Sequence, residues 1–231
     1  MVSNYIWRGT TFTENKPAVQ ADLDVEDKNG FFIGTFLSNA EFSDEALGDN
    51  AVVSTEIDYL AGKHWVGDVW ELQLTYNRYT FPSAEIFDAD DFSFTGNYKA
   101  FLFELSYMDD YFGYKSIYQY FRVGYGWSYA NKLESTFHIG YNVLSTPKGS
   151  LKTRCLNADC SETAQTLNGA GSPDYFDLYF LNRKVLENGT ILELAFNWTN
   201  RKEYLADEGV VTLKRAKDFA TVISLVLPLI L

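Results

Sequence analysis

Carboxylates recur at every second position of several segments, with apolar side chains between them. In QADLDVE, Asp22 and Asp24 flank Leu23, and in TILELAF, Glu193 lies between two leucines. A strand places successive side chains on opposite faces, so each such segment carries its carboxylates on one polar face. Carboxylates gathered on one surface attract cations and small zwitterions through their combined field. The chemistry that this spacing predicts is therefore electrostatic attraction of cations.

Other kinds of chemistry have less support in the sequence. Only His64 and His138 could serve as a general base, and no serine lies in a motif that would activate it as a nucleophile. Two cysteines without a nearby histidine cannot form a four-ligand zinc site. The acidic segments EFSDEALGDN and IFDADDF lack the spacing of a calcium-binding EF-hand and are expected to be solvated loops. We therefore predict no enzymatic activity, no metal and no cofactor.

The elements that would position these side chains are β-strands. Alternation of apolar and polar residues with a period of two is typical of a strand with one apolar face. The pattern recurs along the chain of 231 residues and predicts a single all-β domain over residues 1–231. About twelve such segments lie near residues 2–12, 18–26, 31–39, 51–61, 65–80, 87–96, 99–108, 115–129, 132–144, 174–185, 190–201 and 214–230.

The connections between these segments alternate between short and long. The short ones, DKNG, AGKHW, GNYK, YANK and ENG, are rich in Gly and Asn, which tolerate the positive φ of tight turns. The long ones include FPSAEIFD, MDDYFGYK and the segment between Leu144 and Asp174. Short turns at one end and long loops at the other are typical of an outer-membrane barrel with periplasmic turns and extracellular loops.

The C-terminal segment FATVISLVLPLIL, from Phe219 to Leu231, is almost wholly apolar. It is too short for a transmembrane helix, which needs about 20 residues, and long enough for a transmembrane strand of about 9–11 residues. Pro228 also disfavours a helix. Aromatic residues make up 17% of the chain, and Tyr and Trp favour membrane interfaces. We interpret the tail as the strand that closes a barrel against the first strand.

A soluble β-sandwich or lipocalin-like barrel would show the same alternation, with its apolar face turned inward. Three features favour a membrane protein: the loop asymmetry, the aromatic content and the apolar C-terminal strand. We therefore expect an antiparallel up-and-down transmembrane β-barrel of about twelve strands, in contact with outer-membrane lipid and lipopolysaccharide. The barrel-assembly machinery would be its partner during biogenesis.

The charge and the two ends of the sequence bear on its location. A formal net charge of −12 opposes nucleic-acid binding, which needs a basic face. The opening MVSNYIWRG has no basic region followed by an apolar one, so we expect that a signal peptide has been removed. Cys155 and Cys160 lie in the polar segment KTRCLNADCSET, where we expect a local disulfide, with two free thiols as the alternative. A disulfide would indicate an oxidising compartment.

Two N-terminal segments carry a resemblance to a known family. SNYIWRGTTFTENKPAVQ, Ser3 to Gln20, and GFFIGTFLSN, Gly30 to Asn39, resemble the start of the TorF-like family of bacterial outer-membrane barrels, and DYFG at residues 110–113 is a weaker similarity. The resemblance extends loosely over the whole length. It implies a barrel in the bacterial outer membrane that is made with a signal peptide, and it brings no catalytic residues. The chain departs from many outer-membrane strands in ending on Leu231 rather than on an aromatic residue.

In such a barrel the residues of opposite parity to the apolar face line the lumen. Their acidic excess predicts cation preference in an open channel, whereas pairing of Arg with carboxylates would pack the narrow bore shut. Arg8 is expected either as a selectivity residue or as a structural ion-pair partner. The expected lumen-lining residues are Arg8, Asp22, Asp24, Glu56, Asp58, Glu71, Glu104, Arg122, Glu134, His138, Asp177, Arg183 and Glu193.

Two functions are compatible with these features. The first is a porin-like channel for passive diffusion of small polar or cationic solutes. The second is a plugged barrel that acts as a structural or interaction protein, in which the long loop 145–173 docks a partner or blocks the pore. A homo-oligomer and a membrane-complex partner are both left open, and the sequence identifies no solute.

Overall fold

A computed structural model describes residues 5–8, 10–13, 16–43, 52–112, 117–129, 132–145, 151–155, 163–167, 174–207, 210–215 and 219–226. Within these ranges the fold is all-β, with one short 3-10 helix, η2 (Glu85–Phe87). No helix in the same ranges is both long enough and apolar enough to cross a membrane.

Eleven strands form one antiparallel sheet, in the order β17-β14-β13-β10-β9-β8-β7-β6-β5-β4-β3. Apart from two inserted hairpins, each strand pairs with the next one in the chain. The strands of this sheet are β3 (Gln20–Glu26), β4 (Phe31–Ser43), β5 (Val52–Val66), β6 (Trp70–Thr80), β7 (Ala89–Tyr98), β8 (Phe101–Met108), β9 (Ile117–Tyr129), β10 (Leu133–Ser145), β13 (Tyr175–Val185), β14 (Ile191–Thr199) and β17 (Phe219–Val226).

Three separate hairpins accompany the sheet. They are β1 (Ile6–Trp7) with β2 (Thr10–Thr11), β11 (Leu151–Cys155) with β12 (Thr163–Leu167), and β15 (Lys202–Asp207) with β16 (Val210–Arg215).

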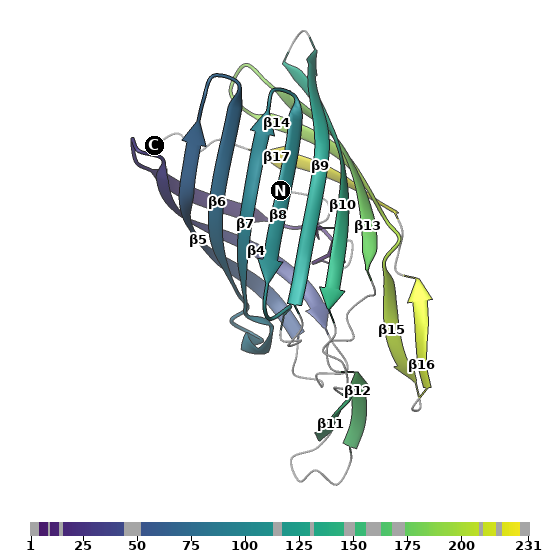
Figure 1. The fold of residues 1–231 in the computed structure, drawn as a ribbon. Helices are drawn as coiled ribbons and strands as arrows, with labels where there is room; N and C mark the ends of the chain where they lie inside the picture. Colours follow the sequence, from purple (N-terminus) through teal and green to yellow (C-terminus); the bar gives the residue numbers. More distant parts are fainter. Residues whose placement is uncertain are drawn as a thin grey trace.

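The sheet curls around an interior (Figure 1). Strands β5 to β10 form the front of this view, while β4 on one side and β14 and β17 on the other pass behind them. Short turns lie at the upper end, and the hairpins β11–β12 and β15–β16 lie toward the lower end with the long connections. The two edge strands are β3 and β17, and no pairing joins them among the described residues.

The alternation in the sequence sets which side chains face outward. In β10, Phe137 and Ile139 are exposed on the outer face, while His138 and Asn142 are buried on the inner face. A shift of pairing by one residue would exchange the two faces, so this pattern also fixes the register. The pairs Phe137↔Phe180 and Ile139↔Leu178 accordingly bring apolar residues of β10 and β13 side by side.

Eleven of the expected segments, from 18–26 to 214–230, correspond in order to the eleven strands of the sheet. The described residues of the first expected segment, 2–12, are not part of the eleven-stranded sheet. They form the small hairpin β1–β2, in which Ile6 pairs with Thr11. The described part of the apolar tail, β17, pairs with β14 and not with the first segment. Among the described residues no pairing joins the tail to the first segment, so closure of the sheet by the tail stays a prediction.

The turn between β3 and β4 is built by side-chain capping. The Asp27 carboxylate accepts the backbone N–H of Asn29 at 2.8 Å and that of Phe31 at 2.9 Å. The hydrogen bond from Phe31 lowers the pKa of Asp27 below its ordinary value. Gly30 follows with φ 83°, and a Cβ there would lie 2.1 Å from the backbone oxygen of His64, so only glycine fits.

Another expected turn, AGKHW at residues 61–65, is wrong. These residues continue β5 to Val66, and the chain turns at residues 67–69, where the Gly67 N–H donates to the Trp70 carbonyl at 2.8 Å. His64 therefore lies in a strand, with its Nδ1 3.4 Å from Glu26 Oε2.

Candidate functional site

The described N-terminal residues lie in the interior of the curled sheet, within an aromatic cluster. The ring centroid of Trp7 is 5.7 Å from that of Phe12, 5.3 Å from that of Phe112 and 5.6 Å from that of Tyr118. The Trp7 indole Nε1 donates to the Tyr79 hydroxyl at 3.1 Å. These rings come from the N-terminal segment, the β8–β9 connection, β9 and β6, so the cluster ties the N-terminus to the wall.

Arg8 is the centre of a polar network beside this cluster. Its Nη2 donates to Asp91 Oδ2 at 2.8 Å, to Glu104 Oε1 at 3.0 Å and to Ser106 Oγ at 2.8 Å. The side chains of Arg8 and Asp91 are only 9% and 3% exposed, so water screens this ion pair weakly. The partners lie on β7 and β8, and Arg8 therefore fixes the N-terminal segment to the middle of the sheet.

The surroundings keep Arg8 charged. Burial alone would lower the pKa of Arg8, but the carboxylates of Asp91 and Glu104 raise it, and the pKa stays well above its ordinary value. The guanidinium Cζ lies 4.5 Å from the ring centroid of Trp7 and 4.8 Å from that of Tyr120, within the range of cation–π attraction. Of the two expected roles of Arg8, these contacts favour the structural ion-pair partner.

A cavity of about 320 Å³ lies next to Arg8. Arg122 Nη2 lies 2.5 Å from Glu104 Oε2, so Glu104 bridges two arginines. Asp177 accepts a hydrogen bond from Asn142 Nδ2 at 2.9 Å. The expected residues on the wall of this cavity are Arg8, Glu104, Arg122, His138 and Asp177.

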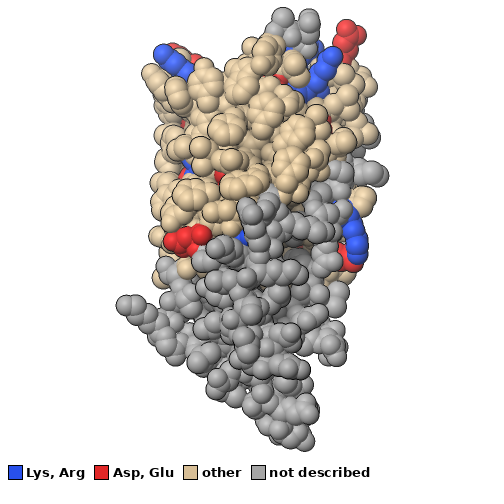
Figure 2. Space-filling model, turned by 90° about the vertical axis from the view of Figure 1, so that its right-hand side faces the viewer, with Lys and Arg blue, Asp and Glu red and all other residues tan. Residues whose placement is uncertain are grey.

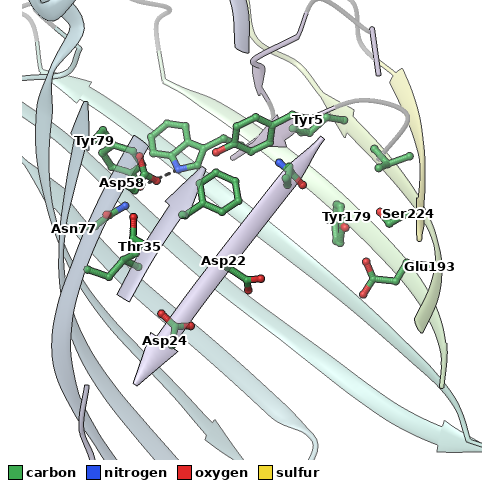
Figure 3. A pocket seen from close by; sticks show the side chains of 16 residues that line it. Tyr5, Asp22, Asp24, Thr35, Asp58, Asn77, Tyr79, Tyr179, Glu193 and Ser224 are labelled. Carbon is green, nitrogen blue, oxygen red and sulfur yellow. Dashed lines mark hydrogen bonds between the residues drawn. The ribbon is translucent and has the colours of Figure 1, made fainter. Parts of the chain in front are cut away.

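A larger cavity, of about 440 Å³, lies between the two edges of the sheet (Figure 3). Its walls come from β3, β4, β5, β6, β13, β14 and β17, and from Tyr5 to Trp7 of the N-terminal segment. Asp24 lies against Gly34 of β4, where a Cβ would be 1.7 Å from Asp24 Oδ1, so glycine makes room for the carboxylate. The expected residues on this wall are Asp22, Asp24, Asp58 and Glu193.

The remaining expected residues lie outside the two cavities. Glu56 is fully buried, and its Oε1 accepts the Tyr5 hydroxyl at 3.3 Å. Burial, followed by the charge of Glu56, raises the pKa of Tyr5 well above its ordinary value. Arg183 Nε lies 3.6 Å from Glu193 Oε1. Glu71 and Glu134 are exposed, and Glu71 accepts a hydrogen bond from Asn97 at 3.1 Å.

Sequence reasoning missed Asp91, the closest carboxylate to Arg8. It lies in IFDADDF, which we expected to be a solvated loop, whereas residues from Ala89 onward form β7 and Asp91 is only 3% exposed. Residues 87–96 were expected to form a strand, but Asp91 was not among the residues expected on its inner face. The alternation of Asp91, Ser93 and Thr95 with two phenylalanines is the signal that places it there.

Two expectations fall on parts of the chain that the structure does not describe. The disulfide between Cys155 and Cys160 lies outside the described side chains, because only the backbone of β11 is described there. Of loop 145–173, the described part beyond Ser145 is the backbone of β11 and β12, which pair from Leu151↔Leu167 to Cys155↔Thr163.

A family model matches much of the chain. No curated protein matches the chain. Residues 1–153 match the model of the Gcw_chp family, which is described as a bacterial protein of unknown function. The match covers more than half of the chain, including the N-terminal segment and the strands β7 and β8 that bind Arg8 through Asp91 and Glu104. The chain therefore belongs to the Gcw_chp family of bacterial proteins of unknown function.

Proposed function

We propose that this protein is an outer-membrane β-barrel whose interior is plugged by its own N-terminal segment. The observation that supports a location in the membrane is that apolar side chains are exposed while carboxylates are buried, the opposite of a soluble protein. Large apolar residues such as Ile33 and Val123 are 66% and 62% exposed, whereas Glu56 and Asp177 are 0% and 1% exposed. A contiguous apolar surface of this kind is rare on soluble proteins and is the surface that lipid requires.

The distribution of charge over the surface supports the same proposal. In Figure 2, charged side chains on the described surface gather toward its two ends, and the region between them consists mainly of other residues. The exposed aromatic residues Tyr98 and Tyr129 lie at the short-turn ends of β7 and β9, where an aromatic girdle would contact the headgroups. The short turns would then face the periplasm and the long connections the exterior.

The plug is supported by the contacts of Trp7 and Arg8 inside the sheet. Trp7 fills an aromatic cluster, and Arg8 is held by Asp91 and Glu104. Both contacts cross the space that an open channel would need. The plugged barrel would act as a structural or interaction protein, with lipopolysaccharide around it and a partner docked at its long-loop end, where hairpins β11–β12 and β15–β16 lie (Figure 1).

The two edges of the sheet favour the channel as a second candidate function. Lipid cannot satisfy the unpaired backbone groups of β3 and β17, each of which would cost several kcal/mol. The residues Tyr5 to Trp7 line the cavity beside both edges. If the N-terminal segment entered this gap as a further strand, the sheet would close into a barrel with an even number of strands. The segment would then no longer fill the interior, and small polar or cationic solutes could pass.

An outward arginine at mid-strand tests the membrane proposal. We expect Val123→Arg to destabilise the protein in lipid vesicles by about 2–4 kcal/mol, because the charge would lie near the bilayer midplane. Val66→Arg is a matched control, since Val66 is 65% exposed but ends its strand at a turn, where the cost falls to about 0–1 kcal/mol. Guanidinium unfolding measures both. Equal and small effects, within about 0.5 kcal/mol, would indicate a water-exposed face instead.

Conductance of the purified protein in a planar bilayer distinguishes the plug from the channel. We expect no steady conductance for the wild type and steady conductance for the double variant Trp7→Ala with Arg8→Ala, because that variant removes both interior contacts. Wild-type conductance that loses cation preference in Asp58→Asn with Glu193→Gln, but not in Glu71→Gln, would support the channel instead. Glu71 is the matched control because it is exposed and lines neither cavity.

A further inference from the structure

The larger interior cavity has the charge of a cation-binding site. Its wall carries Asp22 and Asp24 from β3, Asp58 from β5 and Glu193 from β14. None of the described residues on this wall is a lysine, an arginine or a histidine. Glu193 lies 3.6 Å from Arg183 Nε, outside this wall, and the described residues place no cation near the other three carboxylates on it. An acidic excess of this kind attracts a cation into the cavity.

A buried and incompletely bonded acceptor points to a ligand. Asp58 is 4% exposed, and its Oδ1 has no hydrogen-bond partner among the described residues. On the neighbouring strand β6, the Oδ1 of Asn77 also lacks a donor among the described residues. Both residues line the cavity. Leaving a buried carboxylate oxygen without a donor is costly, and an ammonium group has three N–H donors to supply.

The walls between the carboxylates are aromatic. Tyr5, Trp7, Phe36, Tyr79 and Tyr179 line the same cavity. Aromatic faces attract ammonium groups by cation–π interaction and also pack against alkyl chains. A ligand with both amino groups and methylene segments would therefore use the polar and the apolar parts of the wall together.

The arrangement of the carboxylates disfavours a metal ion. Calcium takes about 6–8 oxygen ligands around one point. No group of three or more metal-ligating side chains gathers at one point among the described residues. In Figure 3, Asp58 and Asn77 lie at one side of the cavity, Glu193 lies at the other, and Asp22 lies between them. The charges are thus spread along the cavity, as the separated amines of an elongated cation require.

We infer that this cavity binds an aliphatic polyamine, with one ammonium group at Asp58 and Asn77 and another toward Asp22 and Glu193. Binding requires only the folded interior and does not depend on whether the barrel conducts. Its failure would leave the plug proposal standing. Failure of the plug would remove Tyr5 to Trp7 from the wall but would leave the four carboxylates, which lie on strands of the sheet.

Titration calorimetry of the folded protein in detergent tests this inference, with spermidine as the probe. We expect saturable binding to the wild type, weaker binding of butylamine, and an affinity for spermidine reduced about tenfold or more in Asp58→Asn, because one charge-assisted hydrogen bond is lost. Glu71→Gln should bind like the wild type. If Asp58→Asn does not fold, Asp22→Asn on the exposed edge strand replaces it, with the same expected direction.

Three outcomes would overturn the inference. Spermidine could fail to bind the folded wild type. It could bind the wild type and Asp58→Asn equally, which would indicate general attraction to an acidic surface. Calcium chloride could bind with the same dependence on Asp58, which would indicate a metal site instead.

Discussion

Replacing Arg8 by alanine is expected to destabilise the protein by about 3–5 kcal/mol, because the buried carboxylate of Asp91 would lose its counter-charge and Glu104 would lose one of two. Asp91 and Glu104 bind Arg8 at 2.8 and 3.0 Å, and Arg122 would remain to neutralise only Glu104. Asp91 would keep its hydrogen bond from Ser106 but no cation. Reversible guanidinium unfolding in lipid vesicles measures the loss.

Arg78→Ala is the matched control for this prediction. Arg78 also pairs with two carboxylates, Asp88 at 3.4 Å and Asp90 at 2.8 Å, but its side chain is 39% exposed. Exposed ion pairs contribute about 0–1 kcal/mol, so we expect a small effect. If Arg8→Ala were no more destabilising than Arg78→Ala, the interior network would not hold the N-terminal segment. Arg8→Ala combined with Asp91→Asn should recover part of the lost stability, because it removes the unpaired charge.

Replacing Phe112 by alanine is expected to destabilise the protein by about 3–5 kcal/mol through loss of apolar contact and the cavity that remains. Phe112 is 6% exposed, and its ring centroid lies 5.3 Å from that of Trp7 and 5.6 Å from that of Phe12. It also has φ 48°, a conformation that a bulky residue adopts only when its surroundings impose it. The same unfolding assay measures this variant.

Phe101→Ala provides the comparison for Phe112→Ala. Phe101 is the same residue type but is 61% exposed on the outer face, so its removal leaves no interior cavity. We expect a clearly smaller effect. Phe112→Ala should also weaken the packing around Trp7. In a planar bilayer, conducting events should therefore become more frequent. Stability like that of the wild type would contradict the proposal that the β8–β9 connection helps to hold the plug.

The alternation of apolar and polar residues determined the strands of the sheet. The period of two in segments such as LESTFHIGYNV is a local property, because each strand residue points to the face opposite its neighbours. It therefore predicted the eleven strands of the sheet and their order along the chain. It also predicted that Glu104, His138 and Asp177 lie on the inner face. Strand ends were less well predicted at AGKHW, since Gly62 and Lys63 read as a turn but pair with Thr75 and Leu74 in β5–β6.

The placement of the first segment was decided only in three dimensions. SNYIWRG alternates like a wall strand, and nothing in its local pattern separates a strand from an interior plug. Its position follows from partners far along the chain: Arg8 binds Asp91 and Glu104, and Trp7 packs on Phe112. Those residues approach one another because the sheet curls, and a buried arginine is stable only where that curl brings carboxylates to it. The sequence alone therefore determined the strands and their faces, and the tertiary structure decided what fills the space between them.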